Sequence, residues 1–194
     1  MKIFKSIITL FITIAFLSSC SSDDNSGGDN PVGGDHTYDI SITSGILSGT
    51  ELEGTVANED FAGMYFDYQG TKVLNISLGS VASGFNAGGA VVLMNGQSTS
   101  QLNDEYDVDS GGSTLIFTFK KDGEDYSFSS ISGSCSVSNL QTYGVQGVGV
   151  GVGGASYKLN FSGTFKQANY DGLDEDAPIV QMNGILDIKR LVID

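Results

Sequence analysis

SYKLNFSGTFK, residues 156–166, decides the fold class of this 194-residue chain. Every second position is apolar until the glycine, and the positions between are polar. The apolar positions are Tyr157, Leu159, Phe161 and Phe165. A period of two is typical of a β-strand that buries one face. We therefore predict a strand here, with the aromatic residues turned toward a core.

The segment TLIFTFKKDGEDYSFSS, residues 114–130, shows the same alternation on both sides of Asp122-Gly123. Asp-Gly between two alternating runs predicts a β-hairpin, because both central residues of a type I′ turn need positive φ. Further strands are predicted at TYDISIT (37–43), FAGMYFDYQ (61–69), TKVLNISL (71–78), GAVVLMN (89–95), SGSCSVSNL (132–140) and GILDIKRLVI (184–193).

Further turns are predicted at Gln69-Gly70, Asn95-Gly96, Asp171-Gly172 and Asn183-Gly184. After residue 20 there is no run of ten residues with helical periodicity. The chain is therefore expected to be all-β, an antiparallel β-sandwich, with a closed β-barrel as the alternative.

The first residues form a different kind of segment. Lys2 and Lys5 precede an apolar run of 11 residues, Ile7 to Leu17, and small residues follow it. This order is typical of a secretory signal peptide, and the run is shorter than the roughly 20 residues that a membrane-spanning helix needs. We expect a cleaved signal rather than a permanent membrane helix.

Leu17, Ser18, Ser19 and Cys20 resemble a bacterial lipobox. The resemblance implies that the Cys20 thiol receives a diacylglyceryl group, that cleavage precedes Cys20, and that a further acyl chain such as palmitate is added to the new amino terminus. An ordinary cleaved signal with an incidental cysteine is the alternative. Two or more acyl chains give stable membrane anchoring.

The SSDD motif after Cys20, residues 21–24, resembles the export signal of Bacteroidota surface lipoproteins. It implies an outer-membrane lipoprotein that faces the cell exterior, and a solvated acidic linker is the alternative. We predict a signal peptide at 1–19, the lipidated cysteine and a flexible acidic tether at 20–35, and a single all-β domain at 36–194.

The mature chain carries 7 basic and 23 acidic residues, a net charge of −16. Such a charge repels phosphate backbones and anionic lipid headgroups. We therefore expect no nucleic-acid partner, and membrane contact through the lipid anchor alone.

Few residues are suited to catalysis. His36 is the sole histidine and is expected to lie at a mobile junction of tether and domain, a poor place for a Ser-His-Asp or Cys-His arrangement. Cys135 shares a phase with Ile131 and Val137 and is expected to be a buried small residue rather than a reactive thiol. We expect no cofactor and no enzyme activity.

Two acidic loops are the candidates for calcium: Asp104, Glu105, Asp107 and Asp109 in one, and Asp171, Asp174, Glu175 and Asp176 in the other. Neither matches an EF-hand, so solvated turn carboxylates are the preferred interpretation and no metal site is assigned. Gly149, Gly151 and Gly154 fit G-x-G-x-x-G, but a strand follows them instead of a helix, which argues against a dinucleotide loop. Gly149, Gly151 and Gly153 instead share one phase of a strand, and Val148, Val150 and Val152 share the other. We expect a bulky neighbour to cover this glycine face, with an open concavity as the alternative.

Three functions remain open. A binding or structural module with an extracellular protein or glycan ligand predicts an exposed patch, for which Met64, Tyr65, Phe66 and Tyr68 are candidates unless they form a central strand. A carrier of an apolar small ligand predicts an unfilled barrel interior near the glycine-rich strand. A hydrolase predicts two close carboxylates in a cleft.

Overall fold

The computed structural model describes residues 34–58, 62–80, 82–144, 151–169, 172–173 and 176–190. These residues form β-strands joined by turns and short loops, and among them there is no helix long and apolar enough to cross a bilayer. The strands are β1 (His36–Ser44), β2 (Thr50–Val56), β3 (Gly63–Tyr68), β4 (Thr71–Ser80), β5 (Phe85–Met94), β6 (Thr99–Asn103), β7 (Gly112–Lys121), β8 (Glu124–Gly144), β9 (Val152–Asn169), β10 (Gly172–Leu173) and β11 (Ile179–Ile188).

All the strands belong to one hydrogen-bonded sheet, in the order β2-β1-β11-β9-β3-β4-β5-β7-β6-β8, with β10 beside β9. The neighbours are antiparallel apart from the short parallel pairing of β6 with β7. The predictions of an all-β chain and of mainly antiparallel pairing are confirmed.

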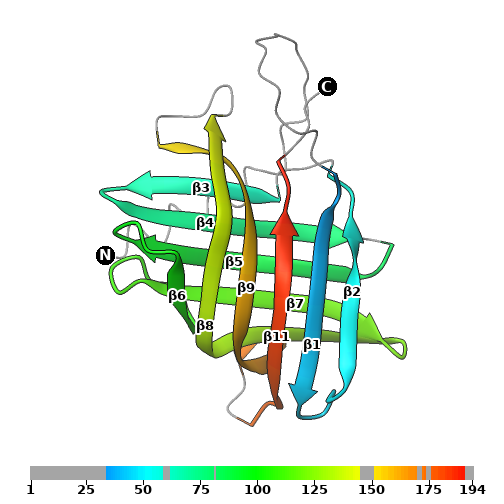
Figure 1. The fold of residues 1–194 in the computed structure, drawn as a ribbon. Helices are drawn as coiled ribbons and strands as arrows, with labels where there is room; N and C mark the ends of the chain where they lie inside the picture. The colour runs from blue at the N-terminus through cyan, green and yellow to red at the C-terminus, as the bar shows by residue number, and fades with distance from the viewer. Residues whose placement is uncertain are drawn as a thin grey trace. The chain divides into compact units, whose positions relative to one another are not determined.

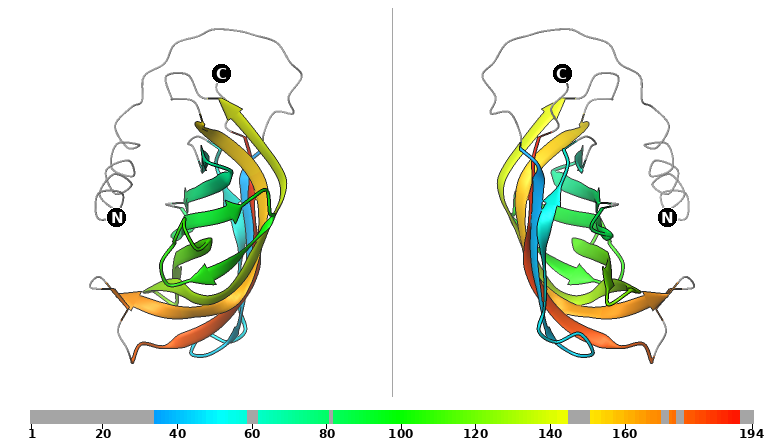
Figure 2. Two further views of the ribbon diagram at one scale, coloured as in Figure 1. Left: turned by 90° about the vertical axis from the view of Figure 1, so that its left-hand side faces the viewer. Right: turned by 90° about the vertical axis from the view of Figure 1, so that its right-hand side faces the viewer.

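The sheet folds into two layers that cross at a steep angle (Figure 1). β3, β4, β5 and β7 form one layer, and β8, β9, β11, β1 and β2 form the other. Figure 2 shows the same two layers from the sides. Because β8 pairs with β7 along its first part and with β9 along most of its length, the layers are parts of one sheet and not two separate sheets.

The pairings also return on themselves, because β3 joins β9 through three residue pairs. Beyond this circuit the sheet continues from β9 through β11 and β1 to β2. Among the described strands, β2 pairs with β1 alone. The β3–β9 contact is short, and β11, β1 and β2 extend the sheet past it to a free edge at β2. The described strands therefore form a partial ring rather than the closed barrel of the alternative prediction.

The bend of β8 connects the two layers. Its register against β9 shifts between Ser130 and Ser132, and Gly133 follows with a φ of 136°. A Cβ at Gly133 would collide with the backbone of Gly163 on β9. Glycine is therefore required at this crossing, where two backbones approach closely.

The same bulge changes which residues of β8 face the core. Phe128 is buried before it, whereas Cys135 and Val137 are buried after it. Ile131 lies at the bulge and is half-buried. The prediction that Ile131 shares a phase with Cys135 was wrong, because one extra residue reverses the alternation.

Buried serines replace ladder partners where the strands separate around β6. The Val92 amide donates to Ser113 Oγ at 2.9 Å, and the Leu115 amide donates to Ser130 Oγ at 3.0 Å. The Ser130 hydroxyl in turn donates to the Asn103 carbonyl at 2.7 Å. These hydroxyls satisfy backbone groups that would otherwise be buried without a partner.

A cluster of aromatic rings fills the space between the layers. Its rings are Tyr38, Phe85, Phe117, Phe119, Phe128, Phe161 and Phe165. Phe117 on β7 is fully buried, and its ring centroid lies 6.4 Å from Phe85, 5.0 Å from Phe161 and 5.6 Å from Phe165. The predicted core faces of residues 114–130 and 156–166 therefore meet each other.

Three of the predicted turns are confirmed. Both residues of Gln69-Gly70, Asn95-Gly96 and Asp122-Gly123 have positive φ. Asp171 lies outside the described residues, so that turn stays a prediction. Asn183-Gly184 was predicted wrongly, because both residues lie inside β11 and pair with β1 and β9. A Cβ at Gly184 would come within 2.9 Å of the Ile40 Cα, so this glycine permits close strand contact rather than a turn.

We predict that Phe117→Ala lowers the free energy of unfolding by about 3–5 kcal/mol, because it removes a buried ring and leaves a cavity. Ile116→Ala is the matched control, since Ile116 is the neighbouring residue on β7 and is 41% exposed. That substitution should cost no more than about 0.5 kcal/mol. Urea denaturation measures both values, and equal losses would contradict the central position of Phe117 in the core.

Candidate functional site

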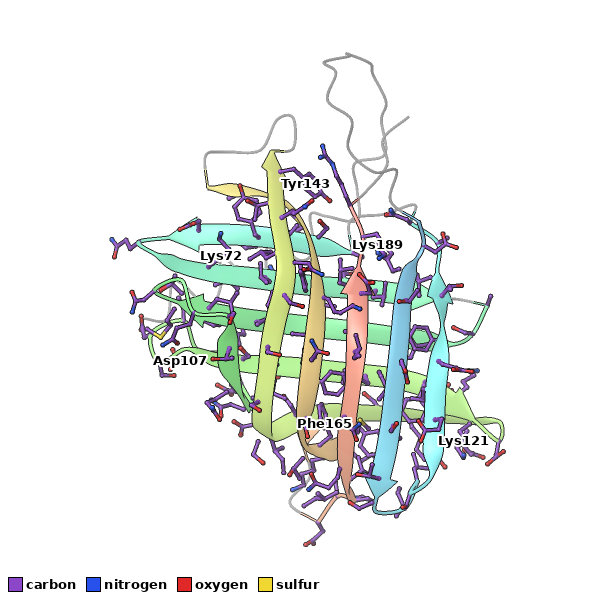
Figure 3. The ribbon with its side chains drawn as sticks, in the orientation of Figure 1. Lys72, Asp107, Lys121, Tyr143, Phe165 and Lys189 are labelled. Carbon is purple, nitrogen blue, oxygen red and sulfur yellow. The ribbon has the colours of Figure 1, made fainter. Side chains whose placement is uncertain are left out.

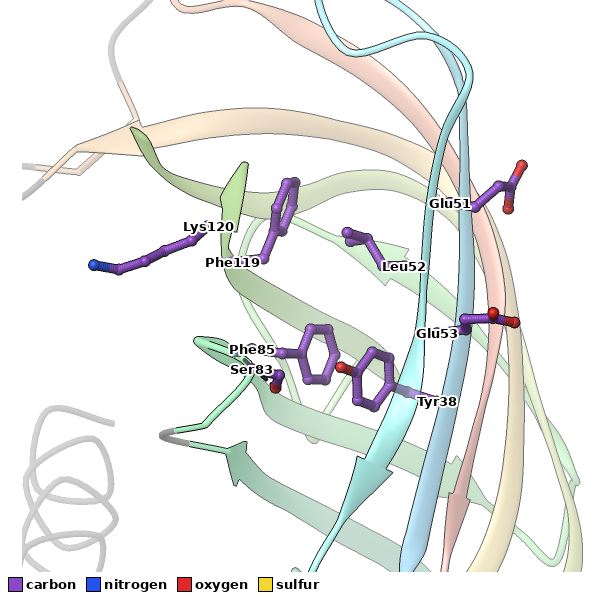
Figure 4. Close-up of a pocket in the computed structure, with 8 residues that line it drawn as sticks. All are labelled: Tyr38, Glu51, Leu52, Glu53, Ser83, Phe85, Phe119 and Lys120. Atoms are coloured by element: carbon purple, nitrogen blue, oxygen red, sulfur yellow. Dashed lines mark hydrogen bonds between the residues drawn. The ribbon is translucent and has the colours of Figure 1, made fainter. Parts of the chain in front are cut away.

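The candidate site is an open pocket of about 260 Å³ on the free-edge side of the sheet, between the two layers. It lies between β1 and β2 on one side and the ends of β5 and β7 on the other (Figure 4). Its lining residues are Tyr38, Glu51, Leu52, Glu53, Ser83, Phe85, Phe119 and Lys120.

The inner wall of the pocket is aromatic and aliphatic. Tyr38 and Phe85 lie parallel, with ring centroids 3.7 Å apart and an interplanar angle of 9°. Leu52 and Phe119 face the same space (Figure 4). Leu52 is half-buried, so its side chain is available to an apolar group of another molecule.

Glycine at position 54 makes room for the Tyr38 ring. Gly54 pairs directly with Tyr38 across β1 and β2, and a Cβ there would lie 2.6 Å from the tyrosine hydroxyl. The ring therefore lies over the strand backbone, as aromatic residues often do opposite a glycine in a sheet. Gly54 belongs to β2 (TELEGTV), the strand that forms the free edge of the sheet.

The charged residues of the pocket point away from its interior. Glu51 and Glu53 extend from the outer face of β2, and Lys120 extends from the opposite rim (Figure 4). Ser41 donates a hydrogen bond to Glu51 Oε2, which keeps this carboxylate on the outer face. The two carboxylates nearest to the pocket therefore do not flank a position inside it, where a hydrolase would need them.

His36 is fixed rather than mobile. It is the first residue of β1, pairs with Val56, is 1% exposed, and accepts a hydrogen bond at Nδ1 from the Lys189 amide at 3.0 Å. The expectation of a mobile junction was wrong, because β2 and the residues after β11 enclose this end of β1. Burial lowers the pKa of His36; Asp35 and Asp187 oppose this effect, and Lys189 adds to it. Its Nε2 is buried without a hydrogen-bond partner among the described residues.

Cys135 is 3% exposed, as predicted for a buried small residue. Burial raises the pKa of its thiol to about 11, although hydrogen bonds with Ser113 and Ser100 act in the opposite direction. The thiolate is the reactive form of cysteine. A thiol with this pKa stays protonated at neutral pH.

In the first acidic loop, residues 104–109, the Asp107 carboxylate stabilises the local turn. Asp107 accepts hydrogen bonds from the Asp109 amide and the Ser110 hydroxyl, at 2.9 Å each, and its backbone pairs with Gly112. Figure 3 shows Asp107 beside β6. Asp104 accepts from the Glu105 amide at 3.0 Å. These contacts agree with the interpretation of Asp104 and Asp107 as carboxylates that stabilise a turn.

In the described part of the chain, no three histidine, cysteine or acidic side chains gather as a metal site would require. Of the second loop, Asp176 is described and exposed. Asp171, Asp174 and Glu175 lie outside the described residues, so their calcium hypothesis stays a prediction.

The predicted surface patch divides between two faces of β3. Tyr65 packs against the core and lies beneath Lys72, whose Nζ is 5.8 Å from the ring centroid. Met64 and Phe66 are half-buried on the other phase of the strand. β3 lies between β4 and β9, so it is an interior strand of the sheet. The Tyr68 side chain lies outside the described residues.

Tyrosine rings lie over Gly153 and Gly154, on opposite faces of β9. A Cβ at Gly154 would overlap the Tyr143 ring, and one at Gly153 would lie 2.9 Å from the Tyr65 ring. Tyr143 is near the end of β8 (Figure 3), and Arg190 lies 4.7 Å from its ring centroid. The prediction of a bulky neighbour is confirmed at Gly153, whereas Gly154 lies on the opposite phase of β9. A Cβ at Gly151 would instead lie 3.1 Å from the Asp67 carbonyl oxygen. Residues 145–150 lie outside the described residues.

The pocket was not predicted from the sequence, because β2 was not among the expected strands. TELEGTV has apolar side chains at Leu52 and Val56 only, with Gly54 between them on the same phase, so its alternation is weak. Glu51 and Glu53 on one phase were the available signal of a strand with an exposed face. The opposite wall, Phe85 and Phe119, comes from residues remote in sequence and had no local signal.

Comparison with known proteins does not identify a relative. No protein-family model matches the chain, and no curated protein or solved structure matches it.

We predict that His36 makes stability depend on pH. Its folded-state pKa is lowered, so below pH 6.5 the unfolded chain binds a proton that the folded protein resists. The free energy of unfolding should therefore be highest with respect to His36 above pH 6.5, where the imidazole is neutral in both states. It should fall as the pH drops from 6.5 through the folded-state pKa of His36. Each unit of lowering corresponds to about 1.4 kcal/mol. His36→Asn keeps an acceptor for the Lys189 amide without titrating. Urea denaturation of the wild type and of His36→Asn from pH 7.5 to about pH 5 tests this. If the free energy of unfolding falls equally in both proteins, His36 is not the cause of the pH dependence.

We also predict that Cys135 does not react with a soluble thiol reagent in the folded protein. The test uses the Cys20→Ala chain at pH 8, in which Cys135 is the one thiol in the sequence. Unfolding in urea should release one reactive thiol. Adding Ser134→Cys, at the exposed neighbouring position, should give one fast-reacting thiol before unfolding. Fast reaction of Cys135 itself would contradict its burial.

Proposed function

We propose that this protein is a lipid-anchored outer-membrane lipoprotein, displayed at the cell surface, whose β-domain acts as a binding module. The observation that carries the proposal is the position of Cys20, directly after the apolar run and preceded by Leu17, Ser18 and Ser19. Acyl chains on Cys20 would hold the chain in the membrane. The acidic tether would separate the anchor from the domain.

The pocket beside β2 supports a binding role for the domain. Its wall is formed by the buried rings of Tyr38, Phe85 and Phe119, its mouth by half-buried Leu52, and its rim by exposed charged side chains. Binding sites commonly combine apolar walls with a few polar groups. Extracellular protein is the favoured ligand class, because a free sheet edge adjoins the pocket.

The two alternatives have less support. A carrier was predicted to have an unfilled interior near the glycine-rich strand, but the Tyr65 ring occupies that position at Gly153. A hydrolase was predicted to have two carboxylates in a cleft, but Glu51 and Glu53 point away from the pocket. Neither observation favours a second function.

We predict that Cys20→Ala abolishes acylation and membrane retention. Intact mass of the membrane-purified wild-type protein should include the diacylglyceryl and amino-terminal acyl groups, and both should be absent from the variant. Ser21→Ala is the matched control and should remain acylated. An unmodified, water-soluble wild-type protein would contradict lipid anchoring.

Surface display is tested on the same cells with external protease. Wild-type protein should be cleaved on whole cells, and Asp23→Ala/Asp24→Ala should remain acylated but become protected, since the variant removes the acidic export motif. Equal cleavage of both proteins would show that surface display does not depend on the acidic motif. Protection of both would place the domain on the inner side of the outer membrane.

A further inference from the structure

β2 presents a free backbone edge beside the pocket. It ends the strand order and, among the described strands, pairs with β1 alone, in register from Thr50 to Val56. A strand edge with unpaired amide and carbonyl groups is a template for another extended chain. β2 has no proline, and its central residues Glu51, Leu52 and Glu53 line the pocket.

The two faces of this edge differ in chemistry. Glu51 and Glu53 are exposed on the outer face, where Asp39 lies directly opposite Glu53 on β1 and is exposed as well. Leu52 is on the inner face with Tyr38, Phe85 and Phe119 (Figure 4). An added strand would therefore meet carboxylates on one side and an apolar wall on the other.

A second copy of this chain does not fit the edge. Antiparallel pairing of β2 with β2 of another copy, with the outer faces on the same side, would bring Glu51 and Glu53 of both copies together. Like charges across two strands are destabilising. The net charge of the mature chain, −16, adds repulsion between copies.

We propose that β2 pairs with an extended segment of another protein in which lysine or arginine side chains alternate with apolar ones. The inference names a partner for the binding module proposed above and rests on that proposal. The added strand lies about 4.8 Å from β2, and its side chains alternate between the two faces. Its basic residues face Glu51 and Glu53, and an apolar residue packs against half-buried Leu52 at the mouth of the pocket.

Both parts of the site contribute to recognition. Backbone pairing at the edge provides affinity without regard to sequence, and the side-chain pattern provides specificity. Charge complementarity raises the association rate and selects basic over acidic segments. Binding should therefore weaken as salt increases.

The test uses the full-length lipoprotein in detergent and a short labelled peptide of alternating lysine and valine, blocked at both ends. Fluorescence anisotropy should show salt-dependent binding of this peptide and at least tenfold weaker binding of the glutamate–valine peptide. Hydrogen exchange should slow at the β2 amides when the lysine–valine peptide is bound. The same peptide with methylated backbone nitrogens keeps the charges but cannot donate to a strand, so it should not bind.

Charge reversal tests the residues. Glu51→Lys/Glu53→Lys should weaken binding of the lysine–valine peptide at least tenfold and favour the glutamate–valine peptide. Asp104→Lys/Asp109→Lys makes the same change of charge in the loop after β6 and should leave the affinity within twofold. Thermal unfolding of both variants establishes that they fold.

Three results would overturn the inference. Equal binding of the methylated peptide, or equal weakening by the two charge-reversed variants, would reduce the interaction to general charge attraction. If hydrogen exchange at the β2 amides slows as the protein concentration rises, and added peptide does not change it, a second copy occupies the edge. Absence of peptide binding in a protein that is acylated and surface-exposed would reject this partner while the proposed anchoring and display still hold.

Discussion

The contact of Phe117 with Phe85 and Phe161 spans the space between the two layers, and the rest of the fold depends on it. Phe85 and Phe117 come from one layer and Phe161 from the other. Stacked and tilted ring pairs contribute about 0.5–1.5 kcal/mol each beyond the apolar area that they bury. The stack continues to Tyr38 near the free edge, so the same cluster that holds the layers together also forms one wall of the pocket.

Crossing layers within one sheet require a strand that turns between them, and β8 has this function. Its bulge and Gly133 allow the bend, and β6 fills the gap that the bend opens against β7. The cost of such a corner is backbone groups without ladder partners. Ser113 and Ser130 offset this cost, because each hydroxyl accepts from a buried amide. Buried serines at this corner are therefore structural residues and not candidates for nucleophilic chemistry.

The partial ring leaves an edge at β2, and this edge unites the proposed functions of the molecule. A sheet that closed completely would have no such edge, and its pocket would have no neighbouring backbone to pair with a ligand. In the proposed interaction, Glu51 and Glu53 have two effects: they oppose pairing between copies, and they favour a basic partner. For the proposed surface display, an open edge that resists pairing between copies stays available to the proposed basic partner.

Alternation and turn chemistry are local properties, so the all-β class, the core faces of residues 114–130 and 156–166, three turns and the burial of Cys135 could be predicted from the sequence. Four other features depend on the tertiary structure. Gly184 is a strand residue because β1 and β9 enclose it. His36 is buried because distant segments cover it. The layers join in one sheet because β8 bends, and the pocket exists because β2 meets the ends of β5 and β7. Each of these depends on which remote strands become neighbours, and no short stretch of sequence carries that information.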